Sequence, residues 1–362
     1  MIDLNKTRKA TMAKKEKEVV EEFRYSSGCD LIDLCVGGDK GVLGFQGGKW
    51  VNLIGDASSG KSLLCLETIT ANKYKYKDKA RHIYDDSENG FTFDTEERYG
   101  FSSKEKGYTD SETVEQMNYQ HTKFMESLQE DEHGIYIVDS LDGLADKMGI
   151  EMDEDTQKAI AKGKENDAGS YQMSIPKYLS QTYFKMRHGA LDDTKSLCII
   201  TSQVRENVGA GLYGAKLKRG CGKALDLYAN YIIWLKTMCF IEKNGRKVGA
   251  VVHAKVTKAK VKRPYREVIY TVIFDYGIDN VSSNLDFLFD LRSSKNGELL
   301  KRAESIVWEE GIEPMTKDEL VEYIEKNKLK KELKRRTMEK WETIEDSIAS
   351  NRPNKYEDED DE

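Results

Sequence analysis

Residues 55 to 62 read Gly-Asp-Ala-Ser-Ser-Gly-Lys-Ser and directly follow the apolar run Trp50–Ile54. A glycine-rich turn that ends in Gly-Lys-Ser, between a strand and a helix, is typical of a P-loop, in which backbone N–H groups and a helix N-terminus surround phosphate groups. The apolar residues after the turn have the spacing of a buried helix face: Leu63, Leu64, Leu66 and Ile69. The sequence therefore predicts a strand, a turn and a helix that bind a nucleoside triphosphate.

The residue types of this segment suit that chemistry. Glycine lets the backbone curl around the phosphates, Lys61 can reach the β and γ phosphates, and the Ser62 hydroxyl can bind Mg²⁺. A glycine loop without a ligand is the alternative interpretation. The residues expected to hold the nucleotide are Gly55, Asp56, Ala57, Ser58, Ser59, Gly60, Lys61 and Ser62.

The composition predicts one large soluble domain with appendages. The chain has 362 residues, of which 38% are hydrophobic and 33% charged, and it contains four prolines. No apolar run approaches the roughly 20 residues that span a bilayer, and the N-terminus lacks the apolar centre of a signal peptide. We therefore expect a cytoplasmic protein without a membrane segment. The six cysteines show neither a CxxC pair nor a zinc spacing, so we expect reduced thiols.

The net charge does not decide whether the chain binds nucleic acid. The formal charge is −7, but the last six residues, Glu357–Glu362, are all acidic. The rest of the chain is close to neutral, so the distribution of its basic residues has to decide.

Short β-rich runs alternate with helical segments from about residue 47 onward. This alternation predicts an α/β fold with a largely parallel central sheet. Two further candidates, 248–256 and 267–274, have no helix between them and should extend the sheet as an antiparallel pair. The expected parallel strands are 50–54, 81–85, 134–139, 197–203 and 230–236.

The chain divides into four expected parts. The first contains a helix around Lys14–Phe23, broken at Ser26–Gly28, and is a possible contact between protomers. In the third, Thr316-Lys-Asp-Glu319 has the pattern of a capping box at a helix start. The parts are an N-terminal arm (1–35), a core (36–284), a helical region (285–350) and an acidic, disordered tail (351–362).

Polar residues follow other predicted strands. Asp139 ends the apolar run 134–139 and can hold the water shell of a P-loop magnesium, the Walker B role. Carboxylates that could polarise an attacking water lie at or just after the end of strand 81–85, but spacing does not choose among Asp85, Asp86 and Glu88. Gln203, at the carboxyl edge of strand 197–203, could sense a γ-phosphate or could cap a loop.

From Ser27 to about Asn280 the chain resembles the RecA/RadA strand-exchange recombinases, most closely the bacterial and phage RecA-like branch. The motifs that carry the resemblance are Ser27-Gly28 with Asp30, Leu31 and Leu34; Ser58-Ser59-Gly60-Lys61; Ser202-Gln203-Val204-Arg205; Gly222-Lys-Ala-Leu225; and Lys258-Ala-Lys260 with Pro264-Tyr265. Several features depart from the family pattern: Ser62 stands in place of threonine, Ser202 stands in place of asparagine, the loop is about one residue longer between Gly209 and Tyr213, and 285–350 match no C-terminal domain.

The resemblance implies a RecA-like P-loop ATPase core that uses ATP and Mg²⁺. It implies that Glu88 activates water and that Gln203 relays the γ-phosphate state to a DNA-binding loop. It also implies that Lys258 and Lys260 reach a neighbouring protomer's ATP, where they act as an arginine finger does. The alternative for these lysines is the solvated face of a strand.

The resemblance further implies that DNA binds at 206–223, a glycine-rich segment with several basic residues. Tyr213 would wedge between bases, although a tyrosine in a loop can equally be a packing residue. The segment 148–169 would be a first DNA loop, despite its acidic start at Glu151–Asp155. The residues expected to contact DNA are Arg205, Tyr213, Lys216, Lys218, Arg219 and Lys223.

The implied activity is ATP-dependent homologous recombination, in which a helical filament on single-stranded DNA pairs with homologous double-stranded DNA and exchanges strands. Two other classes stay open. One is a hexameric DNA helicase or motor of the same fold, which would unwind duplexes directionally. The other is a non-motor regulatory ATPase that acts on a protein partner.

Overall fold

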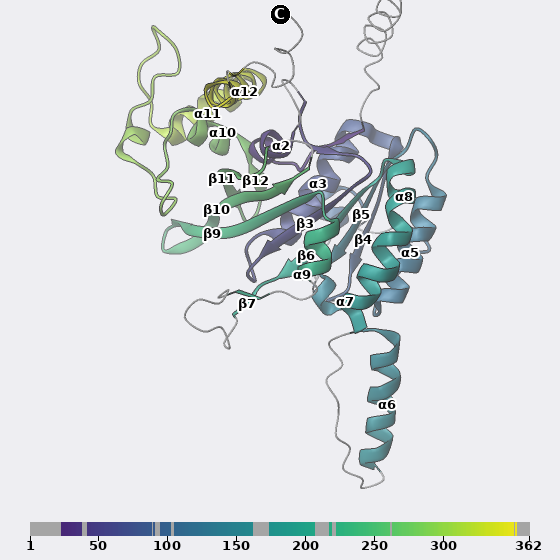
Figure 1. Cartoon of the computed structure of the whole chain (residues 1–362). Coiled ribbons are helices and arrows are strands. Elements are labelled where there is room, and N and C mark those ends of the chain that lie inside the picture. Colours follow the sequence, from purple (N-terminus) through teal and green to yellow (C-terminus); the bar gives the residue numbers. More distant parts are fainter. Residues whose placement is uncertain are drawn as a thin grey trace, which may run out of the picture.

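The centre of the structure is an eight-stranded sheet with helices on both faces (Figure 1). The structure, a computed structural model, describes residues 23–37, 42–88, 90, 95–102, 105–161, 174–206, 217–218, 222–260, 263–350 and 352. In order across the sheet, the strands are β12 (Gly277–Asp279), β11 (Arg266–Ile273), β10 (Arg246–Ala259), β9 (Tyr231–Lys243), β3 (Lys49–Gly55), β6 (Leu197–Gln203), β5 (His133–Asp139) and β4 (Ala80–Asp86).

The sheet has a parallel and an antiparallel part. Strands β9, β3, β6, β5 and β4 run parallel, whereas β10, β11 and β12 continue from β9 as antiparallel neighbours. This confirms the predicted α/β class with a mainly parallel sheet. The predicted strands all occur, but β9 continues seven residues past its expected end at 236, to Lys243. The β9–β10 pair forms a long hairpin that the alternation pattern did not indicate.

Two apolar clusters bury the faces of the sheet. One packs the sheet against α2 and α3, and the other packs it against α5, α8 and α9. These helices are α2 (Asp30–Val36), α3 (Lys61–Tyr76), α5 (Val114–Ser127), α8 (Phe184–Thr194) and α9 (Gly222–Tyr228). Shorter elements are α4 (Thr95–Tyr99), α7 (Ser174–Tyr178), the pair β1 (Arg24–Tyr25) and β2 (Phe45–Gln46), 3-10 turns at Lys77–Lys79, Leu141–Gly143 and Lys301–Glu304, and a π turn at Leu179–Tyr183.

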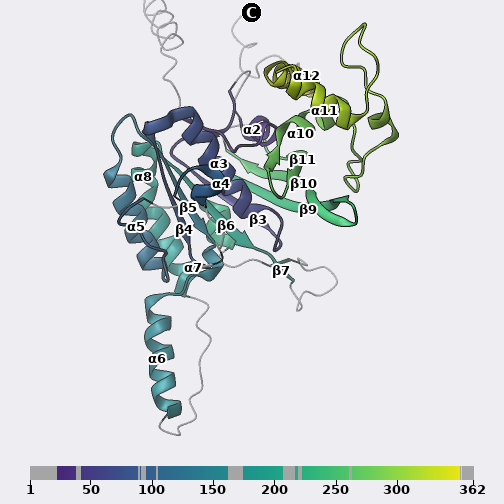
Figure 2. The same ribbon diagram turned by 180° about the vertical axis from the view of Figure 1, so that it is seen from behind.

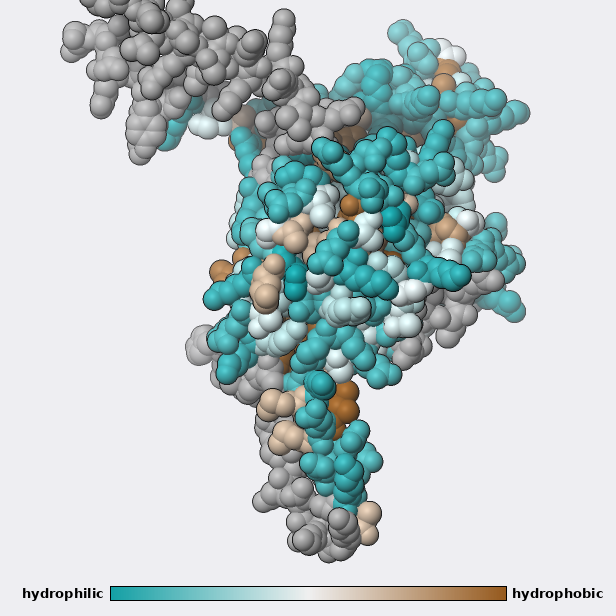
Figure 3. Space-filling view, turned by 90° about the vertical axis from the view of Figure 1, so that its right-hand side faces the viewer, coloured by the Kyte–Doolittle hydropathy of each residue, from teal (hydrophilic) through white to brown (hydrophobic). Residues whose placement is uncertain are grey.

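Helix α6 (Lys147–Ala161) extends away from the body of the molecule, as Figures 1 and 2 both show. The segment 148–169, expected as a DNA loop, therefore begins as a helix, and its residues 162–169 lie outside the described residues. The exposed side chains of this helix include the apolar residues Met148, Ile150 and Met152. The surface of the body of the molecule is largely hydrophilic on the side seen in Figure 3. The sequence of α6 supplies helix formers where the resemblance suggested a loop.

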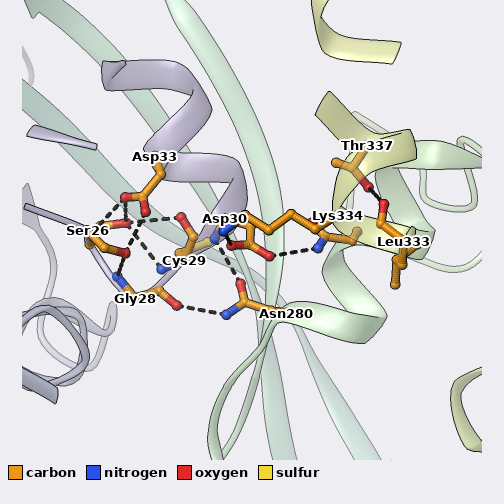
Figure 4. Close-up of polar contacts among 11 residues, drawn as sticks. Ser26, Gly28, Cys29, Asp30, Asp33, Asn280, Leu333, Lys334 and Thr337 are labelled. Carbon is orange, nitrogen blue, oxygen red and sulfur yellow. Dashed lines mark hydrogen bonds and ion pairs between the residues drawn. The ribbon is translucent and has the colours of Figure 1, made fainter. Parts of the chain in front are cut away.

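The C-terminal region has an apolar cluster of its own, built by α10 (Asn280–Leu288), α11 (Lys317–Lys326) and α12 (Lys330–Ser347). The predicted capping box at Thr316 and Glu319 is present. Polar contacts fasten this region to α2 (Figure 4). Lys334 Nζ lies 2.6 Å from Asp30 Oδ1, and Asn280 donates to the Gly28 carbonyl at 2.8 Å.

The expected boundaries at residues 35 and 284 both fall inside helices, α2 and α10. Because α2 is buried in the main core, residues 24–36 pack with the core and not as part of a separate arm. Residues 14–22 of the predicted helix and 353–362 of the tail lie outside the described residues. Along the described parts of the chain, no helix is both long and apolar enough to cross a bilayer. The five described cysteines are free thiols.

Candidate active site

The P-loop forms as predicted between β3 and α3. Gly60, which precedes α3, has φ of 89°, a backbone conformation that side chains other than glycine rarely adopt. A Cβ on Gly55 would lie 2.3 Å from Ser59 Oγ and 2.6 Å from the Leu235 carbonyl oxygen. Glycine is therefore required at both positions for the turn to close.

The turn has the features of an anion site. Among the described residues, no side chain caps the amino end of α3, so its first N–H groups are available to a ligand. Ser59 Oγ is buried and has no hydrogen-bond partner within the described structure. Asp56, Ala57 and Ser58 are exposed at the tip of the turn. These groups fit a phosphate chain, which would supply the acceptors that they lack.

Lys61 points its ammonium group back into the turn. Its Nζ donates to the carbonyl oxygens of Gly55 at 2.9 Å and Asp56 at 2.8 Å. Burial lowers the pKa of Lys61, while the charges of Asp139, Glu88 and Asp56 act in the opposite direction. A phosphate would replace two neutral carbonyl partners with a charged one, which makes a stronger hydrogen bond.

Ser62 and Asp139, the two residues predicted to bind Mg²⁺, both interact with the hydroxyl group of Tyr84. Tyr84 on β4 donates to Asp139 Oδ2 and also interacts with the Ser62 side chain. Asp139 Oδ1 accepts a hydrogen bond of 2.6 Å from Thr201 Oγ1. Burial and the charge of Asp139 raise the pKa of Tyr84, so its proton stays in place. A hydroxyl and a carboxylate suit Mg²⁺, which takes oxygen ligands and keeps several waters.

The three carboxylates that spacing could not separate have different surroundings. Asp85 is fully buried and accepts hydrogen bonds from Ser111 and Tyr136, and burial raises its pKa. Asp86 is buried and bonded to the Gly90 amide at 3.3 Å. Glu88 is exposed just beyond the strand end. Of the three, Glu88 has the position from which a carboxylate can meet water beside the P-loop.

Gln203 joins this group from β6. The register pairs it with Gly55, the first residue of the P-loop. Its Nε2 donates to Glu88 Oε1 at 2.7 Å, and its backbone N–H donates to Asp142 Oδ2 at 2.9 Å. The structure thus brings together Lys61, Asp139, Glu88 and Gln203 at the carboxyl ends of four neighbouring strands, where ligands of α/β sheets bind.

Sequence reasoning missed three residues of this site: Tyr84, Ser140 and Thr201. Tyr84 and Thr201 hold the Asp139 carboxylate, and Ser140 Oγ donates to Glu88 Oε1. Each is an uncharged residue inside or directly after an apolar strand. The one available signal was Ser140, a hydroxyl directly after the Walker B aspartate.

Lys258 and Lys260 do not lie at this chain's own P-loop. Lys258 pairs with Ile232 on β9, whereas Gly55 pairs with Leu235, so Lys258 is set back about 10 Å along the sheet. Its Nζ donates to the carbonyl oxygens of Asp226 and Leu227 in the last turn of α9. Burial lowers the pKa of Lys258, and the nearby charge of Lys260 adds to this effect. Lys260 is exposed.

The expected DNA-binding segment follows directly from Gln203. Strands β7 (Arg205–Glu206) and β8 (Leu217–Lys218) pair antiparallel, with Arg205 opposite Lys218. This hairpin and α6 extend from the same end of the molecule in both views (Figures 1 and 2). Lys223 is exposed at the start of α9. Tyr213, Lys216 and Arg219 lie outside the described residues.

Comparisons with known proteins cover most of the chain. Residues 2–279, which end with β12, match the family model described as the RecA N-terminal domain. Protein RecA of Chloroherpeton thalassium is 25% identical over 282 residues, which cover 78% of this chain and 72% of that protein. Protein RecA of Mesoplasma florum is 24% identical over 288 residues, or 79% and 78% of the two chains. The chain therefore belongs to the RecA family.

Proposed function

We propose that this protein is an ATP-dependent DNA recombinase of the cytoplasm. It forms helical filaments on single-stranded DNA, pairs that DNA with a homologous duplex and exchanges strands. The observation that carries the proposal is the hydrogen bond between Gln203 and Glu88. It joins the edge of the nucleotide site to a residue that lies two positions before the β7–β8 hairpin, so one contact links ATP to the DNA-binding segment.

In this proposal the turn from Gly55 to Gly60 surrounds the phosphates of ATP with backbone N–H groups. Lys61 moves its ammonium group from the carbonyl oxygens of Gly55 and Asp56 to the β and γ phosphates. Ser62 is a Mg²⁺ ligand, and Asp139 holds the ion through water. The bound Mg²⁺ supplies positive charge against the negative charge that develops during phosphoryl transfer.

Glu88 orients and deprotonates the attacking water, since its carboxylate is exposed beside the P-loop. Gln203 senses the γ-phosphate by sharing its amide group between Glu88 and the nucleotide. A change at Gln203 passes directly to Arg205 and the hairpin, because only Val204 lies between them.

Lys258 and Lys260 act on the ATP of a neighbouring protomer. Their distance from this chain's own P-loop supports a role in trans, since neither reaches the site from within its own subunit. Positive charge from a second subunit makes hydrolysis depend on filament assembly.

In this proposal Tyr213 stacks between bases. The basic residues that contact DNA are Arg205, Lys216, Lys218, Arg219 and Lys223. Basic side chains neutralise the backbone phosphates, and stacking on an aromatic ring tolerates any base sequence. Such a surface suits a filament that must bind DNA of every sequence.

The test is ATP hydrolysis with and without single-stranded DNA, for the wild type and for a variant with Lys216, Lys218 and Arg219 changed to alanine. We expect the wild type to be stimulated by DNA and the triple variant to lose the stimulation. Its DNA affinity should also depend less on salt, by about 2 in the slope of log K against log salt. A matched control changes the exposed residues Lys106, Lys185 and Lys295 to alanine. If the wild type hydrolyses ATP at the same rate with and without single-stranded DNA, the result would favour a regulatory ATPase that acts on a protein.

A further inference from the structure

We propose that Ser140 is a positioning residue that holds Glu88 in its reactive orientation. The inference rests on the proposed function, because it assumes that Glu88 activates the attacking water. Ser140 follows Asp139 at the end of β5 and is 1% exposed. Its Oγ donates to Glu88 Oε1.

Ser140 and its neighbour also hold the backbone beside Glu88. The Ser87 N–H donates to the Asp139 carbonyl oxygen at 3.0 Å, and Ser87 Oγ donates to the Ser140 carbonyl oxygen. Three hydrogen bonds therefore tie residues 87 and 88 to residues 139 and 140. Without them, Glu88 would lie at an unsupported turn past the last residue of β4, Asp86.

One side of Glu88, a residue that is otherwise exposed, packs against the turn at Gly143. Gly143 approaches it so closely that a Cβ at residue 143 would lie 3.0 Å from Glu88 Cγ and 3.0 Å from the Ser87 carbonyl oxygen. The Gly143 N–H donates to the Ser140 carbonyl oxygen at 3.1 Å, which fixes this turn against Ser140. The Glu88 side chain thus has contacts with the 140–143 turn on one side and with Gln203 on the other.

The two donors reach the same oxygen of Glu88. Ser140 Oγ and Gln203 Nε2 both bond to Oε1, and one carboxylate oxygen has two lone pairs for such bonds. With both donors on Oε1, Oε2 is the oxygen that we expect to accept a proton from the attacking water. Ser140 is fixed on the β5 end, whereas Gln203 precedes the DNA-binding hairpin, so Ser140 is the constant support and Gln203 the variable one.

The test compares variants by steady-state ATP hydrolysis in saturating single-stranded DNA. Changing Ser140 to alanine should lower kcat by about tenfold, the expected loss for one hydrogen bond to a charged group. The KM for ATP and the affinity for a non-hydrolysable analogue should stay within about twofold. Ser140→Thr keeps the hydroxyl and should restore most of the rate. If the alanine variant folds poorly, Ser140→Cys replaces it in the test, because cysteine has a similar volume but is only a weak donor. The cysteine variant should then show the same loss of kcat.

The matched control is Ser196→Ala, at the start of β6. Ser196 is fully buried and its Oγ hydrogen-bonds Thr194 Oγ1 at 2.8 Å, so the change removes a similar bond far from Glu88. It should lower the melting temperature and leave kcat unchanged. Equal kcat in the two alanine variants, or a loss confined to nucleotide affinity, would overturn the role of Ser140. If Glu88→Gln retains full activity, the proposed role of Glu88 fails instead, and the two failures are distinguishable.

Discussion

Gln203 Nε2 donates a hydrogen bond of 2.7 Å to Glu88 Oε1, although the two residues are 115 positions apart in the chain. The contact exists because β4 and β6 flank β5 and all three end at the same edge of the sheet. It joins a carboxylate beside the P-loop to the residue that leads into the DNA-binding hairpin. In the proposed function, DNA binding at the hairpin and ATP hydrolysis at Glu88 influence each other through this one side-chain pair.

The first prediction concerns Gln203. Gln203→Ala removes one of two donors to Glu88 and, in the proposed function, the amide group that senses the nucleotide. Stimulation of ATP hydrolysis by single-stranded DNA should fall about tenfold or more, while binding of a fluorescent ATP analogue changes little. Gln129→Ala, an exposed glutamine elsewhere, is the control. Normal stimulation in the Gln203 variant would mean that another route couples the two sites.

Changing Ser59 to alanine should raise the stability of the nucleotide-free protein and lower the stabilisation that a nucleotide adds. Ser59 Oγ is buried without a partner in the described part of the chain, a state that costs about 1–3 kcal/mol. Ser59→Ala should therefore raise the melting temperature of the nucleotide-free protein. It should also reduce the additional stabilisation by an ATP analogue, because a phosphate oxygen can no longer bond the hydroxyl. If the variant gains at least as much stability from the ATP analogue as the wild type does, Ser59 does not contact a phosphate.

Lys258 is expected to stabilise α9 before any filament forms. A cation at a helix C-terminus contributes about 0.3–1 kcal/mol, so Lys258→Ala should speed hydrogen exchange of the Ala229 amide by about two- to fivefold. This amide donates to the Leu225 carbonyl oxygen at 2.8 Å. Measurement without nucleotide or DNA separates this effect from a role at a neighbouring ATP. Lys260→Ala, the same charge change two residues away, should leave the exchange rate unchanged.

Asp33 should make stability depend on pH. Burial raises the pKa of its carboxyl from 3.8 to about 6, despite hydrogen bonds of 2.5 and 2.6 Å from Ser26 Oγ and Ser27 Oγ. Because the folded protein binds this proton more tightly than the unfolded chain does, the contribution is fully present below pH 3.8 and lost as the pH rises through about 6.

Urea denaturation of the wild type and Asp33→Asn at about pH 4 and about pH 7 measures this contribution. The unfolding free energy of the wild type, relative to the variant, should fall by about 2 kcal/mol between the two pH values. Other titrating groups cancel in the difference. A difference that does not vary with pH would show that Asp33 has the same pKa in the folded and unfolded states.

The sequence was sufficient for the parts of the fold that local patterns determine. Apolar runs that end at glycine or polar residues located β3, β5 and β6 to within one residue, because burial on both faces makes such strands largely apolar. The length of the β9–β10 hairpin was not predictable from these runs. Its outer part mixes exposed and half-buried residues and carries several lysines, so hydrophobicity does not mark its end.

The roles of the site residues were also not predictable from local sequence patterns alone. Spacing left Asp85, Asp86 and Glu88 equivalent, since all three lie at or just past the end of one strand. Their roles separate only through partners on other elements, such as Ser111 for Asp85 and Gln203 for Glu88. The contact of Lys258 with the end of α9 likewise depends on tertiary packing between segments about 30 residues apart. Pairings of this kind leave no local trace in the sequence.

The most direct test of the proposed activity is strand exchange between circular single-stranded DNA and a homologous linear duplex, with ATP and Mg²⁺. The account predicts joint molecules that require homology and that disappear in Lys61→Ala and in the triple variant at Lys216, Lys218 and Arg219. Hydrolysis stimulated by DNA without joint molecules, together with directional unwinding of a duplex, would contradict it and indicate a motor of the same fold.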